Sequence, residues 1–303
     1  MSWQFDLVAG PYESPLGGPC WDGEGLLFTQ VVGPTEHGSQ NQILRYDPSS
    51  GDVAEVRTWT YRTVGLARSS DGLLYGGQSM SRRIVQFEED GSTTVPTYKI
   101  GGEYHNEPQD LVVDSQGRVW FADPVQDVAG MPPQFQSRVA FASVNRISAP
   151  PSVYSTIERM TFDTSTPWAV ALSRDEQTLY VSENSVEAEG RRELRAYPIL
   201  SDGTLANPRV LASFGADDRG VHPGVSGMCV DSEGNIVAVA GGAGSGPGAM
   251  VYVFSPEGRP LAAEPVPEGE PTNCAFGDAD LSTLYVTTSD GRLYAVRDSG
   301  RKG

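Results

Sequence analysis

The apolar and polar positions along this chain repeat in a two-strand pattern. Each copy is a short apolar strand, a polar turn with Asp or Gly, and a second apolar strand, as in TVGLARSSDGLLYGGQ and VSGMCVDSEGNIVAVA. Six copies start at residues 18, 63, 108, 167, 225 and 271. This spacing is typical of the blades of a β-propeller, in which each copy forms the inner hairpin of one blade.

The segments between the copies predict the rest of each blade. The dipeptides DG, QG and EG supply the positive φ that tight hairpin turns require, and further strands such as RRIVQFEEDG follow as outer hairpins. Only one strand, GRLYAVR, remains after the sixth copy, so the N-terminal WQFDLVAG is expected to pair beside it and close the ring. The predicted fold is therefore all-β, a single six-bladed β-propeller domain over residues 1–303.

Composition narrows the classes of function. The net charge of −17 and the lack of a Lys/Arg run argue against nucleic acid and anionic membranes as partners. The N-terminus has no basic segment followed by an apolar run, and no apolar stretch approaches the roughly 18 residues of a membrane span. Three widely spaced cysteines are expected to be reduced core thiols. We therefore expect a cytoplasmic protein that acts on a small molecule.

Blade geometry predicts where a site lies. The inner strands start, and the second strands end, on the same face of the disc beside the central channel, and the loops that enter the blades open there too. The candidate site residues collected from these places are Gln30, His105, Glu107, Gln109, Asp123, Trp168, Glu183, His222, Ser226 and Asn273. The long insertion after Asp123 carries Met131, Phe135 and Phe141, and we expect it to be either an apolar lid or a surface excursion.

Several stretches resemble a known family. EPQDLVVDSQGRVWFAD, PWAVALSRDEQTLYV and SGMCVDSEGNIVAVA are similar to the blade signatures of the SMP-30/gluconolactonase/LRE-like proteins, and the resemblance runs from about Gly17 to Arg297. It implies a six-bladed propeller. It also implies a divalent-metal lactonase, in which a Glu, an Asn and an Asp hold the ion and a further Asn lies beside the substrate.

This chain departs from the family pattern at each of those positions. Gly17 stands where the metal-binding Glu is expected, Trp168 replaces the metal-binding Asn, and Ser226 replaces the Asp. Gln109 replaces the Asn beside the substrate and is followed by a retained Asp110. A hard divalent ion needs several oxygen ligands, and an indole offers only an N–H donor. We therefore predict that the family's usual metal site is absent and that no cofactor is bound.

The residues that remain favour a metal-independent enzyme acting on a small apolar or cyclic substrate, by lactone or ester hydrolysis or by acid–base lyase or cyclase chemistry. In this hypothesis Asp123, Glu183, His105 or His222 moves protons. Substrate contacts come from Gln109, Trp168, Ser226, Asn273, Gln30 and Glu107. Two alternatives stay open: a propeller that binds a ligand without chemistry, and a lactonase whose metal has moved to Asp123 and Glu183 with one of the two histidines.

Overall fold

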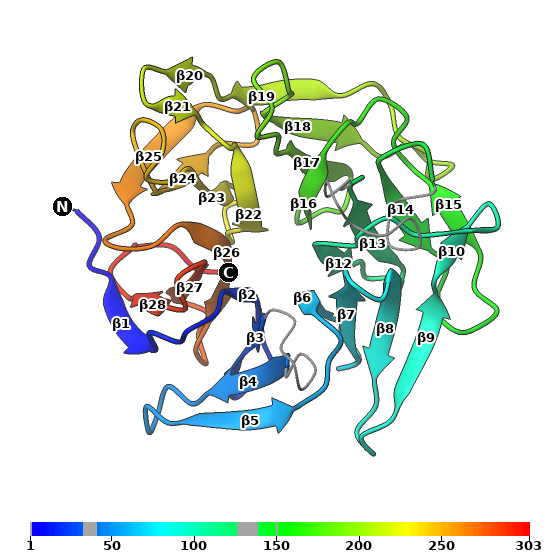
Figure 1. Cartoon of the computed structure of the whole chain (residues 1–303), viewed down its shortest axis with the longest axis horizontal. Helices are drawn as coiled ribbons and strands as arrows, with labels where there is room; N and C mark the ends of the chain where they lie inside the picture. The colour runs from blue at the N-terminus through cyan, green and yellow to red at the C-terminus, as the bar shows by residue number, and fades with distance from the viewer. Residues whose placement is uncertain (1, 33–40, 126–138, 150) are drawn as a thin grey trace.

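The computed structural model describes residues 2–32, 41–125, 139–149 and 151–303. They form six four-stranded antiparallel sheets arranged around a central axis, with the innermost strands β2, β6, β12, β16, β22 and β26 facing that axis (Figure 1). Neighbouring innermost strands contact one another around the whole ring, from β2·β6 to β26·β2. The six-bladed β-propeller predicted from the repeat is confirmed.

The blades follow chain order. Their strands are, for blade 1, β2 to β5 (Leu16–Trp21, Leu26–Gln30, Gln42–Tyr46, Val53–Arg57); for blade 2, β6 to β9 (Thr63–Arg68, Leu74–Gln78, Arg83–Phe87, Thr93–Thr97); for blade 3, β12 to β15 (Leu111–Val113, Val119–Asp123, Ser143–Ile147, Ile157–Arg159); for blade 4, β16 to β19 (Pro167–Leu172, Thr178–Glu183, Glu193–Pro198, Arg209–Ser213); for blade 5, β22 to β25 (Val225–Val230, Ile236–Ala240, Met250–Phe254, Pro260–Pro265); and for blade 6, β26 to β28 (Pro271–Gly277, Thr283–Thr288, Leu293–Val296).

The N-terminal strand closes the ring, as the sequence predicts. β1 (Asp6–Ala9) is the outermost strand of blade 6 and pairs antiparallel with β28, placing Asp6 opposite Ala295. The sheet of blade 6 thereby combines strands from both ends of the chain, and the chain runs from β1 directly into blade 1 (Figure 1). Two short hairpins that the sequence pattern did not predict precede blades 3 and 5: β10–β11 (Lys99–Ile100, Glu103–Tyr104) and β20–β21 (Ala216–Asp217, Gly220–Val221).

The inner hairpins have the predicted turns, with glycines at positive φ. Gly72, Gly117 and Gly234 adopt φ values of 93°, 78° and 84°, the left-handed region that glycine enters at little cost. In blade 4, where the turn has no glycine, Glu176 takes a φ of 54° instead. The same hairpin geometry therefore recurs with and without glycine.

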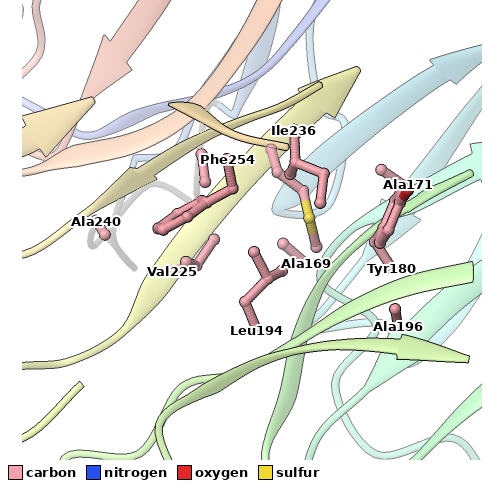
Figure 2. Packing of buried hydrophobic residues seen from close by; sticks show 11 residues of the cluster. Ala169, Ala171, Tyr180, Leu194, Ala196, Val225, Ile236, Ala240 and Phe254 are labelled. Carbon is pink, nitrogen blue, oxygen red and sulfur yellow. The ribbon is translucent and has the colours of Figure 1, made fainter. Parts of the chain in front are cut away.

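The hydrophobic core is divided among the contacts between blades. Figure 2 shows one such cluster between blades 4 and 5, where Leu194 and Tyr180 of blade 4 meet Val225, Ile236 and Phe254 of blade 5. Because every blade buries both faces against its neighbours, the strands read as nearly continuous apolar runs. Among the residues described, no helix is long and apolar enough to cross a membrane.

Candidate active site at the channel mouth

Five of the six inner strands, all except β12, have a shift in pairing register near their start, and these shifts shape the site. The pairing register shifts between Thr63 and Gly65 in blade 2, between Val225 and Gly227 in blade 5, and between Pro271 and Asn273 in blade 6. A residue in such a β-bulge has no partner across the ladder, so its side chain is re-aimed. The bulged residues Val64, Trp168, Ser226 and Thr272 all line one cavity at the mouth of the channel.

This mouth cavity has a volume of about 310 Å³. Of the residues predicted to contact substrate, Gln109, Trp168, Ser226 and Asn273 line it. Its only charged lining residues among those described are Arg62, Asp110 and Glu270. Arg62 and Glu270 are exposed at the rim, whereas Asp110 is 8% exposed, so the interior carries a single carboxyl group in otherwise uncharged surroundings.

Asp110 and Asn273 meet across the channel. They come from blades 3 and 6, which stand opposite each other in the ring (Figure 1), and Asn273 Nδ2 donates a hydrogen bond to Asp110 Oδ1 at 3.2 Å. The equivalent positions of the other four copies of the repeat are Gly18, Gly65, Ala169 and Gly227. Because these residues are small, the two long side chains reach each other over the axis. They form the floor of the mouth cavity.

The environment of Asp110 prepares it for proton transfer. Burial raises the pKa of its carboxyl to about 7, and the hydrogen bonds from Val170 N and Asn273 only partly offset that effect. A carboxyl group with this pKa exchanges its proton near neutral pH, which suits a general acid or base. Sequence reasoning noted Asp110 only as a retained motif residue. Its importance depends on Asn273, which comes from a distant copy of the repeat, so no local pattern marked it.

Two uncharged donors stand near this carboxyl. The side-chain amide of Gln109 lines the cavity and has no hydrogen-bond partner among the described residues. The half-buried Trp168 adds an indole with an apolar face. Ser226 differs, because its hydroxyl already donates to the carbonyl of Pro271 at 2.6 Å. The interior of the cavity therefore combines one ionisable group, the Gln109 amide and one aromatic surface.

Asp123 and His105, both predicted proton carriers, lie outside the mouth cavity as defined by the described residues. Asp123 is 1% exposed and accepts a hydrogen bond from Asn106 N at 3.0 Å, while His105 is fully buried against Phe121. His105 Nε2 lies 3.0 Å from Thr97 Oγ1, and its Nδ1 lies 3.6 Å from Asp123 Oδ2. This pair connects blades 2 and 3 and the loop between them.

Glu183 is held in a comparable way in blade 4. Its carboxylate is fully buried and accepts hydrogen bonds from Ser165 N and Thr166 N, at 3.1 and 2.6 Å. Arg191 and Arg195 lie at 3.4 and 3.9 Å and balance its charge. Asp123 and Glu183, predicted to approach each other at the mouth, are thus bound to different entry loops.

Three further candidates also lie outside the lining of the mouth cavity, within the residues described. His222 stacks on Phe214 and accepts a hydrogen bond from Gly224 N, and burial lowers its pKa, so it is neutral at pH 7. Gln30 donates to Ser14 Oγ at 3.0 Å. Burial raises the pKa of Glu107, which Arg62 and Arg82 partly counteract. The roles predicted for these residues stay predictions.

The predicted lid falls mostly outside the described residues. Met131 and Phe135 belong to the segment 126–138, which is not described. Phe141 is described, and its ring lies 3.8 Å below the guanidinium carbon of Arg159.

The mouth cavity offers few oxygen ligands to a divalent ion. Both carboxylate oxygens of Asp110 already accept hydrogen bonds, and the position of the second family ligand holds an indole. A Cβ at Gly17 would lie 3.0 Å from Val64 O, so a longer side chain at the first ligand position would fit tightly. Across the described ranges, no group of three His, Cys, Asp or Glu side chains is placed to hold a metal ion.

Comparison with known proteins identifies the class. The sequence profile of the SMP-30/Gluconolactonase/LRE-like region matches residues 17–290, so the chain belongs to this family. It is 25% identical to regucalcin of Xenopus laevis, over 94% of this chain and 91% of the relative. It is 25% identical to the pentonolactonase XacC of Haloferax volcanii, covering 90% and 81% of the two chains. The gluconolactonase XC5397 of Xanthomonas campestris superposes with a TM-score of 0.76 at 26% identity, over 97% of this chain and 89% of that one.

Proposed function

We propose that this protein is a metal-independent hydrolase of small lactones or esters, with Asp110 as its general base. The observation that carries the proposal is the buried Asp110 carboxyl, whose pKa is raised to about 7 on the wall of a 310 Å³ cavity. Family membership supports a lactone as substrate, because a pentonolactonase and a gluconolactonase are among the relatives. The open mouth cavity also favours a working site over a plugged channel.

The donors of the site support action without metal. A divalent ion such as Ca²⁺ takes about six to eight oxygen ligands. The described wall offers one carboxylate that is already hydrogen-bonded, one exposed carboxylate at the rim and neutral amides. The same wall is apolar around Trp168 and has Asp110 as the one ionisable group of its interior, which favours an uncharged cyclic substrate.

The proposed reaction needs only these groups. The Asp110 carboxylate takes a proton from a water molecule, and the resulting hydroxide oxygen bonds to the carbonyl carbon of the substrate. The side-chain amide of Gln109, which has no hydrogen-bond partner in the described part of the chain, donates to the carbonyl oxygen as negative charge develops on it. The C–O bond to the leaving alkoxide then breaks, and the proton on Asp110 passes to that alkoxide.

The decisive experiment compares two buried aspartates. A panel of γ- and δ-lactones and aryl esters first identifies a substrate, and Asp110→Asn is then expected to lower kcat by at least about 100-fold with the fold intact by circular dichroism. Asp123→Asn is the control, because Asp123 is buried but lies outside the lining of the mouth cavity. This variant should leave kcat within about threefold. The proposal is wrong if Asp123→Asn abolishes turnover and Asp110→Asn does not.

Two further readouts separate the reaction classes. Turnover in H₂¹⁸O places one ¹⁸O in the product carboxylate if the reaction is hydrolysis, and none if it is a lyase or cyclase reaction. Chelator treatment, followed by addition of Ca²⁺, Mn²⁺ or Zn²⁺, should change kcat less than about twofold. Strict dependence on an added ion would favour a metal enzyme instead, and tight ligand binding with no turnover would favour a binding propeller.

A further inference from the structure

A second cavity lies on the opposite side of the Asp110–Asn273 pair. It has a volume of about 370 Å³ and is lined by residues from all six inner strands. Of the described residues, only Asp110 and Asn273 line both cavities, so their hydrogen bond separates the mouth from this far cavity. The far cavity is lined by apolar side chains together with Arg68 and Arg174, and its lining includes two cysteines.

These two cysteines face each other across a blade boundary. Cys229 lies in β22 of blade 5 and Cys274 in β26 of blade 6, and their Sγ atoms are 3.7 Å apart. A Cβ added at Gly227 would overlap Asn273, so this glycine lets the two strands run in contact just beside the thiols. A disulfide has an S–S bond of about 2.05 Å, so a further approach of about 1.6 Å joins the two sulfurs.

We propose that Cys229 and Cys274 form a reversible disulfide when a small peroxide reaches them through the far cavity. The half-buried Cys229 reacts first: its sulfur takes one peroxide oxygen to become a sulfenic acid, and one water leaves. The Cys274 sulfur then attacks the sulfenic sulfur, the S–S bond forms, and the second water leaves. Two thiols thus lose two electrons and two protons, and one hydrogen peroxide is reduced to two waters.

The thiol environment sets the rate of this step. The hydrogen bond with Cys274, together with burial, raises the pKa of Cys229 well above its ordinary value. The reactive thiolate is therefore scarce at neutral pH, and oxidation should accelerate as pH rises toward 9. Cys20 provides an internal comparison: its pKa is raised to about 12 by burial, and it is a free cysteine outside the Cys229–Cys274 pair.

The disulfide pair is two hydrogen bonds away from Asp110. Cys274 N donates to Asn273 Oδ1 at 2.8 Å, and Asn273 Nδ2 donates to Asp110 Oδ1 at 3.2 Å. Disulfide formation draws Cys274 toward β22. This movement displaces Asn273, whose side chain holds the Asp110 carboxyl in place. On the basis of the proposed function, oxidation should lower kcat by about three- to tenfold and shift the apparent pKa of the rate profile.

The chemical part of the proposal is tested without any substrate. The reduced protein is treated with hydrogen peroxide, denatured and alkylated with iodoacetamide, and its mass is measured before and after dithiothreitol. Reactive thiols should fall from the three of the sequence to one, with a Cys229–Cys274 crosslinked peptide that dithiothreitol releases. Cys20→Ser should form the same crosslink, whereas Cys229→Ser and Cys274→Ala should not.

Three alkylated thiols after peroxide, or a sulfinic acid at Cys229 without a crosslink, would overturn the disulfide. Activity is then measured on the oxidised wild type and on oxidised Cys274→Ala. A crosslink with unchanged kcat would overturn the coupling to Asp110 alone. If the enzyme shows no lactonase turnover at all, the crosslink result still stands, so the two proposals fail separately.

Discussion

At the rim of the channel, the residues that begin the inner strands differ from those that end the second strands in where their side chains point. Trp168 and Ser226 lie in β-bulges and face the mouth cavity. Glu183 and Gln78 pair with the residues just before the bulges, Pro167 and Thr63, and turn to the entry loops of their own blades. The bulge therefore directs the side chain of the bulged residue into the cavity, whereas the side chain that ends the second strand contacts the entry loop.

The second-strand ends share a structural role. Gln78 Nε2 donates to Thr60 O at 2.8 Å, Asp123 accepts from Asn106 N at 3.0 Å, and Glu183 accepts from Thr166 N at 2.6 Å. Each bond ties a loop that enters the blade to the strand behind it, and satisfies a backbone group that would otherwise be buried unpaired. Carboxylates at these positions stabilise loops, whereas the carboxyl at the inner strand start lies in the cavity.

The largest expected effect concerns Glu183. Glu183→Gln removes the charge that faces Arg191 and Arg195, and we expect it to lower the free energy of unfolding by about 3 to 5 kcal/mol. Urea denaturation measures this loss, and kcat per folded molecule should stay within about threefold. A fall in kcat of more than tenfold at unchanged stability would place Glu183 in the chemistry. The second-strand ends would then not be purely structural.

For Asp110 we expect the opposite, a gain in stability on removing the charge. Because its native pKa of about 7 lies above the ordinary value of 3.8, the native state binds the proton more tightly than the unfolded chain. The contribution of Asp110 to the free energy of unfolding is therefore greatest below about pH 4. It falls as the pH rises to about 7 and does not change further at higher pH.

Asp110→Asn removes that cost, which has an upper limit of about 4 kcal/mol for a shift of this size. We expect a gain of about 2 kcal/mol in the free energy of unfolding at pH 8 and little change at pH 4. The gain is below the limit because an asparagine offers one acceptor oxygen to the two donors, Val170 N and Asn273 Nδ2, that Asp110 accepts from. Urea titrations at the two pH values measure it. Asp123→Asn is the matched control and should show no such gain; a loss of stability in Asp110→Asn at pH 8 would contradict the burial argument.

The sequence predicts the fold well and the site only partly. Six copies of one hairpin pattern, with glycine turns, determine the blade number and the closing strand, because periodicity and turn chemistry are local properties. The position of Trp168 and Gln109 at the mouth also follows from the repeat. The prominence of Asp110 does not, because it depends on Asn273, 163 residues away in the chain, and on small residues in four other blades. Likewise, no local signal shows that Asp123 and Glu183 turn away from the channel.

The smallest expected effect concerns Ser226, one of the bulged residues that line the mouth cavity. Ser226 lines the cavity but donates its hydroxyl to Pro271 O at 2.6 Å, so Ser226→Ala should cost about 1 kcal/mol of stability and change kcat by less than about threefold. Thr272→Val is a matched control, because Thr272 donates to Leu16 O at 2.6 Å from the equivalent position of blade 6. Thermal unfolding and steady-state rates on both variants give the comparison. A serine nucleophile would lose far more, about a thousandfold or greater in kcat with stability nearly unchanged, and that result would move the reaction from Asp110 to the hydroxyl.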